Sequence, residues 1–199
     1  VVYQIPQGDL VIYFKIGSNV SDWSGWMVRS KDGGKTWSKR KPLQKDFLGP
    51  VKNKPVMSRG RLIAPSSIES NGWRLYFEYS DDMGKTWQRT DYVEADSITI
   101  EGKKKLKDLA IQPSIILLKD GRLAALARTR SEHIGITYSE DNGKTWSKLK
   151  LIDTPNNNSG LDAVTLSDGN HVLVCNDKPI PNGIKNGKGL RTPLSLMTS

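Results

Sequence analysis

One octapeptide pattern, Ser-x-Asp-x-Gly-x-Thr-Trp, occurs three times and limits the possible folds more than any other feature of this sequence. The copies lie at 30–37, 80–87 and 139–146. A pattern that recurs at intervals of about 50 to 60 residues is typical of repeat architectures, in which each copy belongs to one supersecondary unit. The chain is therefore expected to be a series of similar units.

A second series, of glycines between the octapeptides, marks tight turns. Each stands beside an aspartate or arginine and precedes an apolar run, and the four are Gly8, Gly60, Gly121 and Gly169. Such turns join antiparallel strands. The third unit shows the order best, with strands at 115–118 and 123–128 around the glycine turn and strands at 134–138 and 148–152 around the octapeptide. Four antiparallel strands in a unit of this length are typical of a β-propeller blade.

The predicted fold class is therefore all-β, a β-propeller of four-stranded antiparallel blades. The approximate units are 1–45, 46–95, 108–152 and 160–199, which together make one partial propeller domain of about three to four blades. In each octapeptide the serine and aspartate can cap backbone amides, the glycine permits a positive φ, and the tryptophan can pack between sheets. We expect each octapeptide to form the turn between the third and fourth strands, with Trp37, Trp87 and Trp146 largely buried.

Composition excludes several classes of function. The 199 residues carry 30 Lys and Arg against 21 Asp and Glu, a net charge of +9, and no apolar run reaches the roughly 18 residues of a membrane helix. His133 and His171 lie in different units, Cys175 is the one cysteine, and turns account for the glycines, so we expect no metal and no cofactor. The lysine run 103–105 has no aromatic platform beside it, so nucleic-acid binding is not expected. Membrane insertion is not expected either, because the apolar runs are too short. The positive charge favours an acidic substrate.

Four further segments extend the pattern into a family resemblance. Together with the octapeptides, residues 49–55, 66–69, 111–114 and 155–162 resemble the sialidase-like branch of the bacterial neuraminidase repeat, or Asp-box, family. The resemblance covers nearly the whole chain. It implies a closed propeller of six or so blades, of which this sequence would supply about half, so we expect the chain to be part of a longer polypeptide.

The resemblance also implies an activity, that of an exo-acting glycoside hydrolase. In this family an arginine cluster holds the carboxylate of a sialic acid, a tyrosine paired with a glutamate attacks the anomeric carbon, and an aspartic acid protonates the leaving group. The opening Tyr3-Gln4-Ile5-Pro6 resembles the Tyr-Arg-Ile-Pro motif that supplies the first arginine, with Gln4 at the arginine position. The nucleophilic tyrosine matches no motif here. The substrate class would favour a secreted, periplasmic or cell-surface protein.

Strand alternation sorts the polar residues between two faces of a propeller. The glycine turns and octapeptides fall on one face, and the loops between second and third strands and between blades fall on the other. On that second face, the carboxyls available for proton transfer are Asp162 and Glu69. Asp162 is preferred because it follows an asparagine-rich loop and begins an inner strand. The expected substrate-binding residues are Asn53, Lys54, Gln112, Arg128, Arg130, Asn158, Ser159, Asn176 and Arg191.

Alternatives remain for the arginines and for the function. Arg128 and Arg130 have the alternate spacing of one sheet side and could bind a carboxylate with two forks, or could pair with Glu132 or neighbouring acids. The predicted function is an exo-acting, sialidase-like hydrolase that acts on an acidic sugar at a glycan terminus. The alternatives are hydrolysis or elimination on a glycan that contains uronic acid or rhamnose, and a non-catalytic propeller that binds glycan or protein. Unpaired edges of an incomplete ring would also favour self-association.

Overall fold

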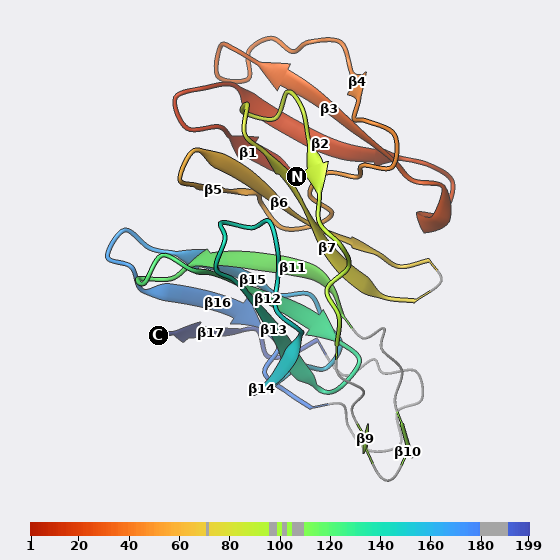
Figure 1. Ribbon diagram of the computed structural model, residues 1–199, viewed down its shortest axis with the longest axis vertical. Helices are drawn as coiled ribbons and strands as arrows, with labels where there is room; N and C mark the ends of the chain where they lie inside the picture. The colour runs from red at the N-terminus through yellow and green to blue at the C-terminus, as the bar shows by residue number, and fades with distance from the viewer. Residues whose placement is uncertain (71, 96–98, 101–102, 105–109, 180–190) are drawn as a thin grey trace.

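Four antiparallel sheets follow one another along the chain and lie side by side (Figure 1). The computed structural model describes residues 1–70, 72–95, 99–100, 103–104, 110–179 and 191–199. Blade 1 contains β1 (Val2–Gln4), β2 (Leu10–Ile16), β3 (Ser24–Ser30) and β4 (Lys41–Pro42) in sheet order. Blade 2 contains β5 (Val56–Ser58), β6 (Arg61–Ile68), β7 (Arg74–Ser80) and β8 (Gln88–Arg89). These two sheets have the strand order that the repeats predict.

The third and fourth sheets continue the series. Blade 3 contains β11 (Ala110–Leu117), β12 (Leu123–Thr129), β13 (His133–Ser139) and β14 (Lys150–Pro155). Blade 4 has three described strands, β15 (Asp162–Thr165), β16 (His171–Cys175) and β17 (Ser195–Thr198). A 3-10 turn, η1 (Val20–Asp22), precedes β3, and a small pair is formed by β9 (Thr99–Ile100) and β10 (Lys103–Lys104). The prediction of an all-β propeller of about three to four blades is confirmed.

The first strands of all four blades, β1, β5, β11 and β15, line one cavity of about 540 Å³. This arrangement is that of a propeller, in which the innermost strands surround a central channel. Three apolar clusters fill the spaces between successive blades, around Tyr13, Phe77 and Leu126. Because β6 has neighbours on both sides, seven of its eight residues are buried. In the described part of the chain, no helix is long and apolar enough to cross a membrane.

The three octapeptides, here called Asp boxes, form nearly identical turns between the third and fourth strands of their blades. In each box the serine hydroxyl donates to the aspartate, at 2.7, 2.7 and 2.9 Å. The threonine hydroxyl donates to the same carboxylate, at 2.5, 2.7 and 2.6 Å. These hydrogen bonds lower the pKa of Asp32 to about 2 and also lower the pKa of Asp141 despite its partial desolvation. The structural interpretation of the boxes is confirmed.

The tryptophans of the second and third boxes pack against the preceding blade. Trp87 is 4% exposed and makes an edge contact with Tyr13 of blade 1, with ring centroids 6.1 Å apart. Trp146 stacks on Phe77 of blade 2 at 3.7 Å. The prediction that Trp37 is largely buried is wrong, because its side chain is 39% exposed. In the described structure blade 1 has no sheet on the side that Trp37 faces, so this tryptophan lacks the contact that its two counterparts make.

Candidate functional site

The face opposite the Asp boxes, called the site face, carries a chain of hydrogen bonds that joins blades 2, 3 and 4. At its centre is Gln112, on β11. The amide nitrogen of its side chain donates to Glu69 at 3.3 Å, and its side-chain oxygen accepts from Arg128 at 3.3 Å. Gln112 has a φ of +57° and lies in a bulge, between Ile111 and Ser114, where the register of β11 and β12 shifts. Bulges of this kind redirect side chains, and here the bulge points Gln112 at both charged groups.

Arg128 is the cation at the centre of this network. We call the network, with Glu69, Gln112, Asn158, Trp73 and Arg130, the Arg128 cluster. The Nε of Arg128 donates to Asn158 Oδ1 at 2.9 Å, and its guanidinium lies 4.9 Å from the ring centre of Trp73. Arg130 lies over the same indole at 4.0 Å. Burial lowers the pKa of Arg128, as do the charges of Arg191 and Arg130, while Glu69 opposes the shift. No carboxylate among the described residues forms an ion pair with Arg128 or Arg130, so the alternative of a salt bridge to Glu132 is not realised.

The asparagine-rich loop presents Asn158 to Arg128. Residues 156–159 are all buried, Asn156 donates to Ser159 O at 3.2 Å, and the Asn158 amide donates to Asn156 Oδ1 at 3.1 Å. Asn158 has a φ of +62°, which asparagine tolerates better than most residues. The loop is therefore fixed by its own amides. Ser159 is 1% exposed, and its hydroxyl has no hydrogen-bond partner in the described structure.

A second loop on the site face comes from the linker between blades 1 and 2. Asn53 is 2% exposed, donates to the carbonyls of Gln112 and Pro113 at 3.0 Å each, and accepts from Lys52 Nζ at 2.9 Å. Lys52 Nζ also donates to Leu161 O at 2.8 Å. The two hydrogen bonds of Asn53 thus stabilise the Gln112 bulge. Lys52 connects this loop to Leu161, at the start of blade 4.

The linker that leads into this loop is fixed by Glu78, which is fully buried on β7. Its carboxylate accepts the amides of Leu48 and Gly49 at 2.9 and 2.7 Å. Lys15 donates to Pro50 O at 2.6 Å beside it. Burial raises the pKa of Glu78 and lowers that of Lys15 to about 8. A buried acid and a nearby amine thus set the path of the linker that carries Asn53 and Lys54.

Asp162 begins β15, as expected, and stands at the inner cavity rather than in the Arg128 cluster. Its Oδ1 accepts from Ser114 Oγ at 2.7 Å and from the Ala163 amide at 2.9 Å. Lys54 lines the same cavity. The negative charge of Asp162 also favours the protonated form of Lys52, although burial lowers the pKa of that lysine overall. One oxygen of Asp162 is therefore committed to local structure, and the other is without a hydrogen bond in the described structure.

The remaining predicted residues are less closely joined to the cluster. Asn176 donates to Pro193 O at 2.6 Å, so its amide supports the chain that follows. Arg191 is exposed, and its positive charge helps to lower the pKa of Arg128. Sequence reasoning missed Trp73 and Ser114, and it places Lys52 on this face without choosing it as a binding residue. Lys52 adjoins a predicted residue, whereas Trp73 gave no signal because tryptophan in this sequence was associated with the boxes.

Gln4 does not lie where the motif resemblance suggested. It ends β1 beside the first glycine turn, and its side chain donates to Ile5 O at 3.1 Å and Gly8 O at 2.7 Å. The glycine turns share the face of the Asp boxes. Gln4 therefore braces a turn on that face, and its position says nothing about an arginine on the site face.

The chain belongs to the BNR repeat-like domain family, whose profile matches residues 1–199. It is 33% identical over 179 residues to the anhydrosialidase of Macrobdella decora, covering 81% of this chain and 22% of that protein. It is 28% identical over 179 residues to a sialidase of Paraclostridium sordellii, covering 76% and 41%. The Trypanosoma rangeli sialidase in complex with the inhibitor DANA superposes with a TM-score of 0.66 at 21% identity, covering 96% and 35%. These findings confirm the predicted sialidase-like repeat family and propeller fold.

The chain spans well under half the length of each of these two curated relatives. The structural likeness to the trypanosomal enzyme, at its low identity, shows the fold. The sequence likeness is to parts of two proteins that are named an anhydrosialidase and a sialidase.

Proposed function

We propose that this chain is the part of a sialidase-like glycoside hydrolase that holds an acidic sugar at a glycan terminus. The observation that carries the proposal is the guanidinium of Arg128. It is oriented by the neutral side-chain oxygens of Gln112 and Asn158 and not by a carboxylate. An arginine held by neutral acceptors keeps its charge for a ligand, and its fork matches a carboxylate.

The surroundings of Arg128 fit an anionic ligand. Arg130 and Arg191 add positive charge, and their repulsion of Arg128 would be relieved by a bound carboxylate. Lys52 and Lys54 extend the positive surface toward the inner cavity. Interactions of this kind matter most where burial lowers the dielectric, and Arg128 is half-buried. The cluster is therefore suited to a carboxylate and poorly suited to a neutral sugar.

Two carboxyls are the proposed groups for proton transfer. Glu69 shares the hydrogen-bond network of Arg128 through Gln112, whereas Asp162 faces the inner cavity with one free oxygen. A general acid has to reach the glycosidic oxygen while the sugar carboxylate lies on the arginines. Two single variants, Glu69→Gln and Asp162→Asn, separate the two candidates. The variant of the carboxyl that transfers the proton should lose most turnover, and the variant of the other carboxyl should keep it.

The test is a panel of fluorogenic glycosides with the full chain. We expect release from an α-sialoside, no release from a neutral β-galactoside, and loss of release in Arg128→Gln. Arg122→Gln on the box face is the matched control, because Arg122 is exposed and paired with Asp120. Uronic-acid oligosaccharides are included, with an unsaturated product as the sign of elimination. Binding of acidic sugars without turnover of any of them would contradict the proposal and support a binding propeller.

A further inference from the structure

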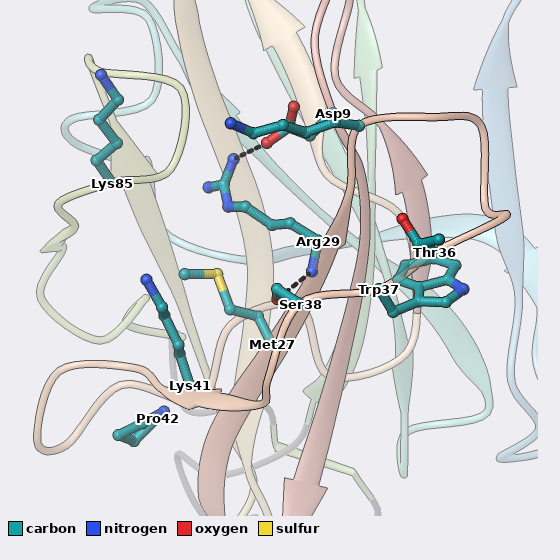
Figure 2. A pocket seen from close by; sticks show the side chains of 10 residues that line it. Asp9, Met27, Arg29, Thr36, Trp37, Ser38, Lys41, Pro42 and Lys85 are labelled. Carbon is teal, nitrogen blue, oxygen red and sulfur yellow. Dashed lines mark hydrogen bonds and ion pairs between the residues drawn. The ribbon is translucent and has the colours of Figure 1, made fainter.

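A groove on the box face, away from the Arg128 cluster, forms a cavity of about 730 Å³ (Figure 2). It lies between blade 1 and the Asp box of blade 2. Met27 and Pro42 give it an apolar part. Its charged lining residues come from the first glycine turn, β3, β4 and the first two Asp boxes, and they are Asp9, Arg29, Lys31, Lys41 and Lys85.

Arg29 fixes the geometry of this groove. Its guanidinium donates to the carbonyls of Met83 and Gly84 in the second box, at 3.1 and 2.9 Å, and lies 3.6 Å from the carboxylate of Asp9. These contacts join the two blades, so the walls of the groove are held together. In Figure 2, Asp9 lies above the guanidinium of Arg29, and Met27, Lys41 and Lys85 lie toward the left of the view.

The three lysines of the groove are not neutralised. Lys31, Lys41 and Lys85 are exposed, and within the described structure none of their ammonium groups makes a hydrogen bond or ion pair. The one acid in the lining, Asp9, is already beside Arg29. The groove therefore has an excess of positive charge.

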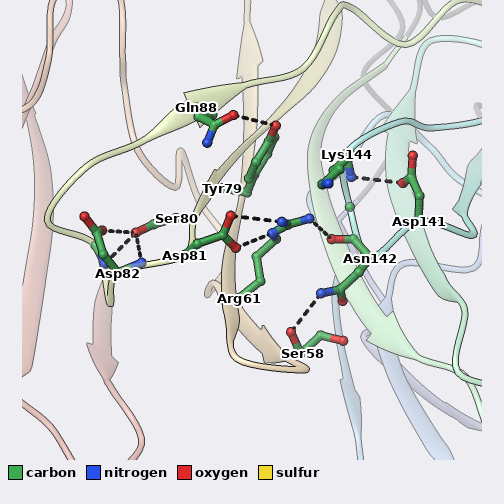
Figure 3. Close-up of polar contacts among 12 residues, drawn as sticks. Ser58, Arg61, Tyr79, Ser80, Asp81, Asp82, Gln88, Asp141, Asn142 and Lys144 are labelled. Carbon is green, nitrogen blue, oxygen red and sulfur yellow. Dashed lines mark hydrogen bonds and ion pairs between the residues drawn. The ribbon is translucent and has the colours of Figure 1, made fainter.

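The corresponding junction between blades 2 and 3 has a smaller excess of positive charge, so the excess at the first junction differs from one repeat to the next (Figure 3). The register pairs Leu10 with Ser30 and Leu62 with Ser80, so Arg61 corresponds to Asp9, and Asp81 corresponds to Lys31. Arg61 donates to Asp81 at 2.6 and 2.9 Å and to Asn142 O at 3.2 Å.

Lys144, which corresponds to Lys85, lies near Asp81 and helps to lower the pKa of that carboxyl. An acid thus offsets part of the positive charge at this second junction. At the first junction the same position holds Lys31, which adds a cation. The first junction therefore has four cations and one acid in its lining, whereas the second has Arg61 and Lys144 with Asp81 between them.

We propose that the groove between blades 1 and 2 is a second, non-catalytic glycan site that binds a stretch of carboxylate-bearing oligosaccharide. Three ammonium groups from separate elements suit several carboxylates along a chain, and the apolar surface of Met27 and Pro42 suits the faces of sugar rings. The choice of a carboxylate-bearing glycan rests on the proposed function, because the Arg128 cluster is suited to the same chemistry.

The experiment measures binding by calorimetry, in the full chain with the Arg128→Gln change throughout, so that the site face does not contribute. The probes are a hexamer of galacturonic acid, a neutral xylose hexamer and a six-nucleotide single-stranded DNA. Lys31→Asp gives the first junction the acid that the second one has, and Lys85→Gln removes a rim cation. Lys144→Gln is the matched control, because it changes the same box position at the junction where Asp81 offsets part of the positive charge.

We expect the acidic hexamer to bind more weakly at higher salt, about tenfold more weakly in Lys31→Asp and several-fold more weakly in Lys85→Gln, with no change in Lys144→Gln. Equal binding by all variants, equal binding of the neutral hexamer, or preference for the oligonucleotide would overturn the proposal. Activity is not the readout, so a failure here leaves the hydrolase proposal standing, and absence of hydrolysis does not affect this test.

Discussion

The two faces of the propeller are built on different principles. On the box face, three turns repeat the same hydrogen bonds with nearly the same distances, and each carboxylate is used within its own turn. The network on the site face has no such repeat, because Glu69 and Asn158 come from two loops and meet Gln112 on β11 and Arg128 on β12. The difference teaches that repetition marks the residues that make the blades, and departure from it marks the residues available for chemistry.

The largest expected effect lies in the packing between blades. Trp87→Ala should lower the free energy of unfolding by about 3–5 kcal/mol, because it opens a cavity against Tyr13. Trp37→Ala, at the same box position, should have a much smaller effect in this chain because that ring is exposed. Urea denaturation followed by fluorescence measures both. Equal losses would show that box position, rather than contact with the preceding blade, decides the contribution.

On the site face, Arg128→Lys keeps the charge but loses the fork that contacts Gln112 and Asn158. The lost hydrogen bonds to a charged group should lower kcat/KM on a carboxylate-bearing substrate by about 10- to 100-fold. Stability should change little. Arg122→Lys on the box face provides the comparison and should leave kcat/KM unaltered. If Arg128→Lys retained full activity, the cluster would not be the carboxylate site.

Within the box face, Asp82→Ala removes the acceptor for the Thr86 amide and hydroxyl and for Ser80. The expected loss of unfolding free energy is about 1–2 kcal/mol, with no effect on ligand binding at the site face. Glu140→Ala, at an exposed box position outside this hydrogen-bond pattern, should be close to neutral. A loss of sugar binding in Asp82→Ala with stability intact would contradict the separation of the two faces.

Acid should weaken the box face before it changes the packing between blades. The pKa of Asp32 falls from 3.8 to about 2 on folding, and those of Asp82 and Asp141 are also lowered. A lowered pKa contributes stability above pH 4 that is lost as the pH falls through the folded value. Unfolding free energies should therefore be flat above pH 5 and decline between pH 4 and 2. A decline that starts near neutral pH would contradict this account. Glu78 could not cause such a decline, because its raised pKa makes the folded state more stable as the pH falls.

The smallest expected effect concerns Trp73, which lies under Arg128 and Arg130. Trp73→Phe should raise the KM for a carboxylate-bearing substrate only a few-fold, since an aromatic face remains for the two guanidinium groups. Trp73→Leu should raise it further, with little change in affinity for a neutral sugar. A similar loss for both substrates would mean that Trp73 supports the loop in general and does not orient the arginines.

The sequence predicts the fold well because the fold depends on local, repeated chemistry. Gly121 and the octapeptide at 139–146 specify their turns within a few residues, so the strands around them follow. The family also follows from this pattern. The arrangement of the site does not, because it depends on positions that only the folded chain brings together.

Three residues show why. Gln112 reaches both Glu69 and Arg128 because β11 bulges there, and no local motif indicates the bulge. Asp162 was preferred as a member of the same constellation, yet its Oδ1 is used by Ser114, 48 residues earlier in the sequence. Trp37 matches Trp87 in sequence, but its burial depends on the neighbouring sheet and not on its own turn.

The tryptophan of each box completes the core of the blade before it, and this has a consequence for how such a chain folds during synthesis. Blade 1 buries Tyr13 against Trp87, and blade 2 buries Phe77 against Trp146. The core of one blade therefore closes only after the next box, about one repeat later, has emerged from the ribosome. Folding would trail translation by a blade, and nearest-neighbour coupling of this kind makes the pair of blades, rather than the single blade, the cooperative unit.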